Sequence, residues 1–563
     1  MRRRVAAVLA CLTALSAGCT AVPTSGPVVP VPAEPNPVNP GVRVNPHPPT
    51  RGESAEDVVD GFVAAMASYE TGYEVAREYL TPEAAARWDP RAGVQVYEQK
   101  AAPTLTGGRY VLSTQRLGAV NSEGIFRQAT GTITHDFGVV RDASGEWRIA
   151  NPPTGLLVSQ SIFSTSFLRI NAYHYDPSGQ WLVPEPHYFP RGPHARDRAA
   201  AAVLGGPAAW LAPSVQAGPT LDLDSTEVDA AGVVTVKVKP TASPLPDAEE
   251  QRVVTRMVWT FRQFPYVTKL RVLSADGTPW TFPGNPGGTV PMSFGLDASP
   301  VAAQTSRQLF AIRNGRLVRV LDIEQNTNVL GAAPGATGLT AAAVRGDAVQ
   351  AAVVQNGRTL ALAGVTEPSL QPILTAKSIG RPHFSRQGEV FAPVDGGLRV
   401  YANGAWTSLT VGGLPDGAVT NVRVAPDGTR LALVVRRTDG RCAAGIARIE
   451  RHDGRIRVAG WTELGVRQLS GDNPSVTDVA WASDSEVLLV TSINGGTSVV
   501  HSDQEGAQSN TMGPAGATGI SVLAGAPGVA PVVRLADSET MRYSSNMRWL
   551  PLEGATSSVL YPG

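Results

Sequence analysis

The carboxy-terminal half of the chain repeats one pattern of hydrophobic and polar positions. An apolar stretch, a short polar turn and a second apolar stretch follow one another most clearly in residues 422–434 and 479–490. Weaker copies surround residues 384–388 and 344–347. Apolar runs of this length, bounded by Gly, Pro, Asp and Ser, are typical of β-strands joined by tight hairpins. The pattern predicts an all-β region. In it, Asp427-Gly428 is expected to provide the backbone conformation of a tight hairpin turn.

The first apolar residue after each turn gives a measurable period. Six such residues are spaced 40, 41, 41, 56 and 42 positions apart: Leu309, Val349, Val390, Leu431, Val487 and Val529. A repeat near 41 residues with four short strands per unit indicates a β-propeller. We assign the spacing of 56 to a longer unit around residues 438–471. Residues 286–563 are therefore predicted to form a propeller of about six blades, or seven if one copy is too degenerate to recognise.

Residues 166–285 change to a mixed pattern in the order β-β-α-β-α-β. The predicted strands are 168–173, 182–189, 233–238 and 267–272, and the predicted helices are 197–204 and 247–262. Gly205-Gly206-Pro207 ends the first helix. In the second, apolar residues recur on one face, and Asp247 with Glu250 is arranged like a capping box. This order resembles the GerMN domain, a small α+β module of bacterial envelope proteins.

Residues 51–165 begin with helices and continue with strands. Ser54 and Asp57 form an amino-terminal capping pattern before a run of apolar residues at helical spacing. Two further helical stretches cover residues 73–80 and a segment that starts at Pro82. Strands are predicted at 94–97, 110–113, 130–137 and 147–150. The order predicts an α+β domain and resembles the cone-shaped fold of the nuclear-transport-factor-2 type.

The first 19 residues have the anatomy of a secretory signal. Arg2, Arg3 and Arg4 precede eleven apolar-rich residues, and Ser16-Ala17-Gly18 leads directly into Cys19. An apolar segment this short does not span a bilayer. Small residues before a Cys resemble the lipobox of bacterial lipoproteins, although Ser16 stands where Leu is usual. The resemblance implies a signal peptide over residues 1–18 and a diacylglyceryl group on Cys19.

Residues 19–50 are predicted to be a spacer between that anchor and the folded domains. Ten prolines fall between residues 20 and 50, and proline fixes φ and donates no backbone hydrogen bond. Lys+Arg and Asp+Glu are equal at 48 each, which argues against a nucleic-acid partner. We therefore expect a protein held at the extracytoplasmic face of the cell membrane through Cys19.

The sequence offers little for catalysis or metal binding. The zinc-helix, phosphate-loop and nucleophile-elbow motifs are absent, and three cysteines, Cys11, Cys19 and Cys442, are too few for a disulfide framework. His174, His187 and His194 share the middle block at spacings that match no compact metal site, and we expect them not to converge. Turn geometry is the expected role of five propeller aspartates: Asp347, Asp427, Asp472, Asp478 and Asp484. No enzyme activity and no cofactor are predicted.

The order of these parts is more specific than any one of them. A lipobox Cys, a Val-Pro-Thr-Ser-Gly-Pro segment at residues 22–27, a spacer, an α+β domain, a GerMN-like domain and a propeller follow one another. This layout resembles the actinobacterial lipoprotein LpqB family. The resemblance implies a non-enzymatic accessory lipoprotein that interacts with the extracytoplasmic domain of the sensor kinase MtrB. It would thereby modulate MtrAB-type two-component signalling linked to the cell envelope and division.

Two other classes of function stay open at this stage. A cell-wall or saccharide binder would use the GerMN-like block on peptidoglycan, and it would expose aromatic side chains such as Tyr188, Phe189 and Trp210 on one face. A propeller enzyme would require ionisable residues with perturbed pKa values gathered in the channel. The sequence shows no such cluster.

Overall fold

The computed structural model describes residues 46–563, except 68–70, 99–101, 302–305, 321–326, 331–335, 366–368, 467–473, 515–518, 545 and 553–555. The predicted signal peptide, Cys19, the spacer up to residue 45 and Asp472 lie outside the described residues. The domain boundaries drawn from the sequence stay predictions. The resemblances to the nuclear-transport-factor-2 fold and to the GerMN domain stay predictions as well.

The amino-terminal region begins with α2 (Ala55–Met66), and its predicted capping box is present. The side chain of Ser54 accepts the N–H of Asp57, and the Asp57 carboxylate accepts the N–H of Ser54. The helices that follow are short: η1 (Thr71–Tyr73), α3 (Glu74–Glu78), α4 (Pro82–Arg87) and α5 (Gln160–Ser166). The strands are β1 (Val94–Tyr97), β2 (Thr104–Thr106), β3 (Arg109–Val120), β4 (Phe126–Gln128), β5 (Thr132–Asp136), β6 (Val139–Arg141), β7 (Trp147–Ile149) and β8 (Leu156–Ser159).

The long strand β3 organises this region. It pairs with β1, β2, β4 and β5, and β8 runs parallel to β1. α2 packs against β3 and β8, and its buried face joins Phe62 and Met66 to one hydrophobic core with Phe137. The sequence pattern missed α5, because its Ser and Thr residues are weak helix formers. Ser159 compensates by capping α5 through the N–H of Ile162.

The middle region contains two sheets. β9 (Phe167–Tyr175) and β10 (Leu182–Pro190) form an antiparallel hairpin, and β11 (Leu223–Val228), β12 (Val233–Val238), β13 (Lys269–Leu273) and β14 (Thr289–Pro291) form the second sheet in that order. The helices are α6 (Ala195–Gly205), η2 (Ala212–Ser214), α7 (Asp247–Phe261) and η3 (Leu296–Ala298). The predicted capping box of α7 is wrong, because Pro246 is the N-cap and no side chain caps the helix. Asp247, Glu249 and Glu250 instead lie in the first turn, where the helix dipole favours negative charge.

The remaining strands form six four-stranded antiparallel sheets within the described part of the chain. From inner to outer strand they are β38 (Ser558–Leu560), β15 (Phe310–Arg313), β16 (Arg316–Arg319), β17 (Thr327–Asn328); β18 (Leu339–Val344), β19 (Gln350–Gln355), β20 (Thr359–Gly364), β21 (Leu370–Thr375); β22 (His383–Phe384), β23 (Val390–Val394), β24 (Gly397–Ala402), β25 (Ala405–Leu409); β26 (Gly417–Val424), β27 (Arg430–Arg437), β28 (Cys442–His452), β29 (Arg455–Glu463); β30 (Ser475–Trp481), β31 (Glu486–Ile493), β32 (Gly496–Asp503), β33 (Ser509–Gly513); and β34 (Ile520–Ala524), β35 (Val532–Leu535), β36 (Thr540–Tyr543), β37 (Trp549–Leu552).

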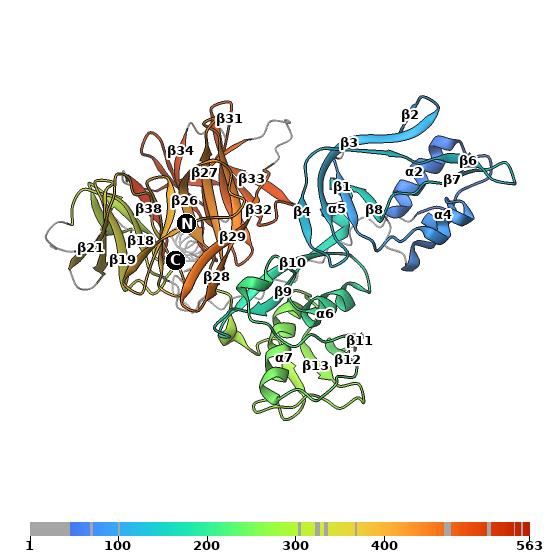
Figure 1. The fold of residues 1–563 in the computed structure, drawn as a ribbon, viewed down its shortest axis with the longest axis horizontal. Coiled ribbons are helices and arrows are strands. Elements are labelled where there is room, and N and C mark those ends of the chain that lie inside the picture. Colours follow the sequence, from blue (N-terminus) through green and yellow to red (C-terminus); the bar gives the residue numbers. More distant parts are fainter. Residues whose placement is uncertain are drawn as a thin grey trace, which may run out of the picture. The chain divides into compact units, whose positions relative to one another are not determined.

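These sheets are the six predicted blades of a propeller (Figure 1). Their inner strands lie side by side in a ring, in the order β18, β22, β26, β30, β34 and β38, and β38 returns to β18. The last strand of the chain thus completes the first blade, because β38 pairs with β15. All six residues used to measure the period lie in or within three residues of the second strand of a blade. The longer unit is the blade β26–β29, whose β28 has 11 residues and β29 has 9.

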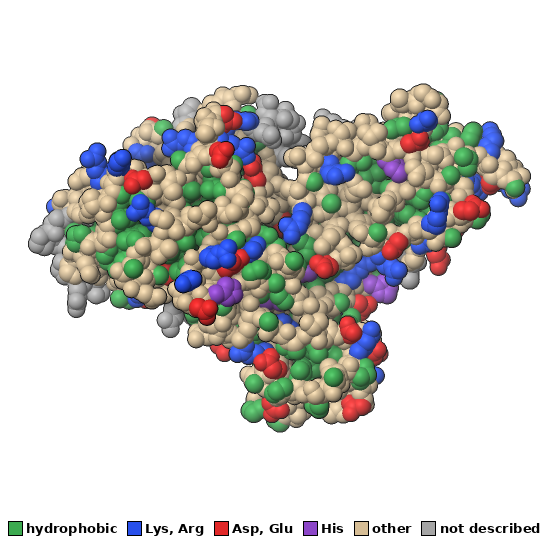
Figure 2. Space-filling view, viewed as in Figure 1, with side chains coloured by type: hydrophobic (Ala, Val, Ile, Leu, Met, Phe, Trp, Pro, Cys, Tyr) green, Lys and Arg blue, Asp and Glu red, His purple; other side chains and the backbone are tan. Residues whose placement is uncertain are grey.

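The surface agrees with the balanced composition. On the face drawn in Figure 2, Lys and Arg side chains are interspersed with Asp and Glu rather than gathered by sign. Such a surface provides no basic stripe for a nucleic acid on this face.

Candidate functional site

The hairpin β9–β10 contacts the amino-terminal region, the rest of the middle region and the propeller. Eight of the nine residues of β10 are buried, so both faces of this strand are covered. Tyr188 belongs to the amino-terminal core, and the next residue, Phe189, belongs to the core of the middle region. Pro184 and Pro186 alternate along β10 and supply no N–H to its free edge, which keeps the hairpin two-stranded.

A loop of the amino-terminal region docks on β10. The N–H of Tyr188 donates to the carbonyl of Gly124 at 2.7 Å, and His187 Nδ1 lies 2.8 Å from the carbonyl of Glu123. Gly124 has a φ of +88°, and a Cβ there would meet the ring of Phe189 at 2.7 Å. Glycine is therefore required both for the backbone conformation and for the close approach of this loop.

Three alternating side chains of β9 face the propeller. The Arg169 guanidinium donates to the hydroxyl and the carbonyl of Ser485 at 3.1 and 2.8 Å, and Asn171 Nδ2 donates to the same hydroxyl at 3.0 Å. The Tyr173 hydroxyl donates to Asp484 at 2.9 Å. Because successive side chains of a strand point to opposite faces, these three residues share one face. The propeller atoms that they contact lie in the turn between β30 and β31.

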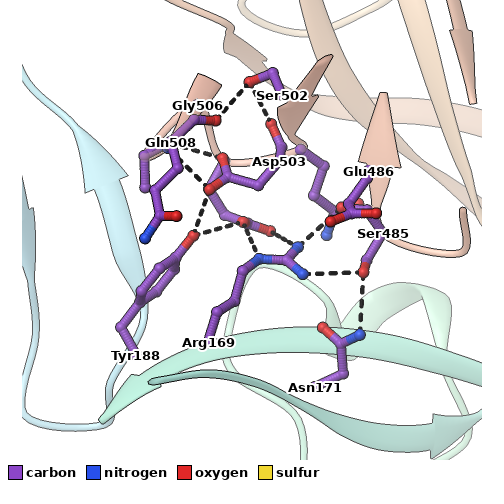
Figure 3. A network of polar contacts seen from close by, with 12 residues as sticks. Arg169, Asn171, Tyr188, Ser485, Glu486, Ser502, Asp503, Gly506 and Gln508 are labelled. Carbon is purple, nitrogen blue, oxygen red and sulfur yellow. Dashed lines mark hydrogen bonds and ion pairs between the residues drawn. The ribbon is translucent and has the colours of Figure 1, made fainter. Parts of the chain in front are cut away.

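The end of β32 and the turn that follows it, in the same blade, supply two carboxylates to this junction (Figure 3). Arg169 binds Glu505 with both Nε and Nη2, at 3.1 and 3.3 Å. The Tyr188 hydroxyl lies 2.8 Å from Asp503 Oδ2 and 3.1 Å from Glu505 Oε2. Two backbone N–H groups of the turn donate to the carboxylate of Asp503. We name Arg169, Asn171, Tyr173 and Tyr188 with Asp484, Ser485, Asp503 and Glu505 the polar junction.

The electrostatics of the polar junction follow from two close carboxylates that share one guanidinium. Burial, together with the charge of Glu505, raises the pKa of Asp503 to about 7. Burial also raises the pKa of Asp484 and of the Tyr188 hydroxyl. Burial alone would lower the pKa of Arg169, but Glu505, Tyr188 and Asp503 together outweigh it and keep that pKa above its ordinary value. At neutral pH, Asp503 is therefore poised between its two protonation states.

A second guanidinium lies behind the junction, inside the propeller. Arg430 has no exposed surface, and it pairs with the buried carboxylate of Asp427 and bonds to Gln504 and the carbonyl of Asp484. Its guanidinium lies 5.4 Å from the centre of the Trp481 ring. Arg430 thus ties together the turns that present Asp484 and Asp503, so the propeller side of the junction is fixed in place.

The amino-terminal region also touches this blade directly. The side chain of Gln128 donates to the carbonyls of Gly465 and Gly506 at 2.9 and 2.6 Å. The turn that carries Glu505 is therefore contacted from two regions of the chain.

The expectation that the middle-block histidines stay apart is wrong for two of them. His174 Nε2 lies 3.3 Å from Glu185 Oε2 across the β9–β10 hairpin, and His187 Nε2, in β10 itself, lies 3.3 Å from the same oxygen. Burial opposes it, but the hydrogen bonds from both histidines lower the pKa of Glu185 to about 2. His194 lies elsewhere and contacts Asp197. Among the described residues, no group of three or more His, Cys, Asp or Glu has the geometry to hold a metal ion.

The propeller aspartates were all assigned to turns, and one assignment is wrong. Asp347, Asp427 and Asp484 do lie in turns. Asp478 lies instead within β30, where it is 4% exposed and pairs with Arg381. An aspartate in a strand is stable there because its carboxylate is fully engaged by donors.

The aromatic face that would favour a saccharide binder is not formed by the residues expected to form it. Tyr188 and Phe189 are 1% and 5% exposed, inside two hydrophobic cores. Trp210 is partly buried against the propeller, where its Nε1 donates to the carbonyl of Gly460 at 2.8 Å. These three residues join domains instead of presenting a sugar-stacking surface.

Cys442 begins β28 as a half-buried free thiol. Within the described part of the chain, no helix is both long and apolar enough to cross a bilayer.

Two protein-family models match this chain, one in its amino-terminal region and one over the propeller. The model described as "Lipoprotein LpqB, N-terminal domain" matches residues 48–164, and that of the "Lipoprotein LpqB beta-propeller domain" matches residues 315–562. A curated Lipoprotein LpqB of Cutibacterium acnes is 29% identical over 98% of this chain and 98% of its own length. Another, from Streptomyces avermitilis, is 26% identical over 100% of this chain and 98% of its own.

Solved structures resemble the chain only remotely. TolB from Acinetobacter baumannii aligns with a TM-score of 0.34 and 15% identity over 61% of this chain and 99% of that one, which is too distant to carry a functional argument. The assignment therefore comes from the two family models and from relatives that align along nearly the whole chain. This chain belongs to the LpqB lipoprotein family.

Proposed function

We propose that this chain is a membrane-anchored accessory lipoprotein that binds the extracytoplasmic domain of the sensor kinase MtrB and modulates MtrAB-type signalling. The choice of partner comes from the resemblance to the LpqB family. The lipid on Cys19 would retain the protein at the extracytoplasmic face of the membrane. No catalytic step is part of this proposal.

The observation that carries the proposal is the polar junction. Loose domains are usually joined by exposed linkers with few contacts across the boundary. Here Arg169, 18% exposed, and Glu505, 11% exposed, form a bidentate pair between the hairpin and the propeller. A contact of this kind favours a firmly connected scaffold, in which a partner bound to one region is held at a defined position relative to the others.

Such a scaffold would act on the kinase through an equilibrium. A protein that binds one conformation of a sensor more tightly than another shifts the population toward the first, by no more than the difference in binding free energy. The proposed mechanism therefore requires unequal affinity for the two signalling states of the kinase, and it requires no chemistry.

Crosslinking in intact membranes followed by affinity capture of the full-length lipoprotein tests the proposal. We expect mass spectrometry to find the sensor kinase enriched with the native chain and depleted with Cys19→Ala, which lacks the lipid attachment point. Arg436→Met, at an exposed position of β27, is the matched control and should capture the kinase normally.

Capture of cell-wall material without the kinase would contradict the proposal and support the saccharide-binding alternative. Equal kinase capture by the native chain and by Cys19→Ala would contradict the role of the anchor.

A further inference from the structure

A cavity of about 510 Å³ opens at one end of the propeller ring, the end at which the turn between β30 and β31 carries Asp484 and Ser485 of the polar junction. Residues at or just beyond the ends of all six inner strands line it, among them Phe384, Arg423, Trp481 and Gly525. The cavity is therefore the mouth of the central channel. Trp181, from the turn of the β9–β10 hairpin, borders it from outside the propeller. Its size is in the range of small-molecule sites.

Arg423 is the charged group that distinguishes this cavity. It lines the cavity and is only 6% exposed. Its Nη1 donates to the neighbouring carbonyl of Val422 at 2.6 Å. Among the described residues, no carboxylate lies within 4.0 Å of its guanidinium. A buried guanidinium without a paired anion is costly unless another group compensates its charge.

The buried carboxylate whose charge acts on Arg423, that of Asp478, is already fully engaged. Its Oδ2 accepts from the Arg381 guanidinium and from the N–H of Leu523. Its Oδ1 accepts from the side chain of Asn421 and from the N–H of Val479. Two guanidinium groups, those of Arg381 and Arg423, thus share one carboxylate whose acceptor positions are occupied.

The charge on Arg423 persists at neutral pH. Burial, reinforced by the charge of Arg381, lowers the pKa of Arg423 to about 9, which leaves it protonated. His383, which also lines the cavity, has a pKa lowered to about 3 by burial and by Arg423, so its ring is neutral. The deep part of the cavity therefore carries a net positive charge.

The rim differs from the deep part, because it carries charged side chains of both signs. Asp347 is held by Arg345 at 2.6 Å, and Asp297 is exposed to solvent. Gly563, the last residue, also lines the cavity, and an oxygen of its terminal carboxylate accepts the N–H of Phe384 at 3.2 Å. Arg386 stacks on the ring of Trp181 at 4.2 Å. An entering anion would pass these groups before it reached Arg423.

We propose that the mouth of the propeller channel binds a small organic anion, with its carboxylate or phosphate group on Arg423. The rest of the ligand lies against the apolar walls formed by Phe384, Trp481 and prolines of the cavity. The charge imbalance selects an anion, because a charge-assisted hydrogen bond to a desolvated guanidinium is stronger than one to a neutral donor. This site is independent of the proposed contact with the kinase.

Isothermal titration of the whole chain with benzoate and, separately, with inorganic phosphate tests the site at pH 7 and low salt. We expect saturable binding of one probe per chain. Tighter binding of benzoate would indicate a carboxylate ligand with an apolar body, and tighter binding of phosphate a phosphorylated one. Arg423→Gln should weaken the binding by about ten- to a hundredfold. Arg436→Gln, at an exposed position outside the cavity, should leave it unchanged.

Two further measurements test the proposal if the Arg423→Gln variant does not fold. Arg423→Lys retains the positive charge and should retain saturable binding, weakened several-fold. In the native chain, binding should quench tryptophan fluorescence, because Trp181 and Trp481 line the cavity. Absence of saturation by both probes up to about 10 mM overturns the proposal. So does unchanged binding in a folded Arg423→Gln.

Discussion

The polar junction and the channel mouth both contain buried charges that do not balance, and their imbalances have opposite signs. At the junction, the guanidinium of Arg169 pairs with Glu505, and its charge also acts on Asp503, which the Tyr188 hydroxyl links to Glu505. At the channel mouth, Arg381 and Arg423 share the carboxylate of Asp478. Acidic groups therefore outnumber basic ones at the junction, and basic groups outnumber acidic ones around Asp478.

The difference lies in how each excess charge can be relieved. A carboxylate can take up a proton near neutral pH, and the pKa of Asp503, raised to about 7 by burial and by Glu505, shows that this is within reach. An arginine with a pKa of about 9 does not lose its proton at neutral pH. The acidic group can thus compensate itself with solvent protons, whereas the basic group needs an anion from protein or ligand.

The largest expected effect comes from removing the shared carboxylate at the channel mouth. Asp478→Asn leaves two buried guanidinium groups without an anion, and we expect the free energy of unfolding to fall by about 3–5 kcal/mol. Urea titration would measure the loss. Asp347→Asn, which makes the same change in a partly exposed pair with Arg345, should cost no more than about 1 kcal/mol. Equal losses in the two variants would show that the carboxylate of Asp478 stabilises the fold no more than the partly exposed carboxylate of Asp347 does.

Removing the shared guanidinium at the junction should cost less, because protons can compensate. We expect Arg169→Met to lower the free energy of unfolding by about 2–4 kcal/mol at pH 8. The loss should shrink at pH 5, where Asp503 takes up a proton. Urea titration at both pH values is the measurement, with Arg436→Met as an exposed control that changes stability by about 0.5 kcal/mol or less. A loss that is independent of pH would show that the two carboxylates are not coupled to this guanidinium.

The titration of Asp503 itself gives the third prediction. Its pKa is raised to about 7 in the folded chain, from an ordinary value of 3.8. The folded state therefore binds a proton that the unfolded state has released. The associated stability is complete below pH 4 and is lost as the pH rises through 7.

Asp503→Asn cannot titrate and should abolish this part of the pH dependence. Between pH 4.5 and 8, we expect the native chain to lose about 1–3 kcal/mol relative to Asp503→Asn. The difference between the two chains removes the contributions of other carboxyl groups, such as Asp484. Parallel stability curves for the two chains would mean that Asp503 keeps an ordinary pKa.

The propeller and most of its strands could be predicted from the sequence, because they follow from local patterns. The period of the apolar residues located all six blades. It placed strand starts only approximately, since Val349 is 52% exposed in a turn and β19 begins one residue later. The ring closure by β38 could not be read locally, because that strand pairs with one almost 250 residues earlier.

The polar junction was missed because its residues come together only in three dimensions. The alternation of Arg169, Asn171 and Tyr173 with the buried Ile170 and Ala172 was a signal that could have been used. It indicates one polar and one apolar face of β9, but not what covers the polar face. His174 and Glu185 meet because the hairpin pairs Val183 with His174, and the sequence of the turn does not fix that register.

The smallest expected effect tests the junction through a single hydroxyl group. Tyr188→Phe removes the donor shared by Asp503 and Glu505, and Tyr79→Phe removes a hydroxyl that donates to the neutral carbonyl of His47 at 2.7 Å. Each change should cost about 1 kcal/mol. Hydrogen bonds to ionised acceptors are stronger than those to neutral ones. The cost of Tyr188→Phe should therefore increase from pH 5 to pH 8, while that of Tyr79→Phe stays constant. If both costs change alike with pH, the acidic excess does not reside at the junction, and the contrast with the channel mouth fails.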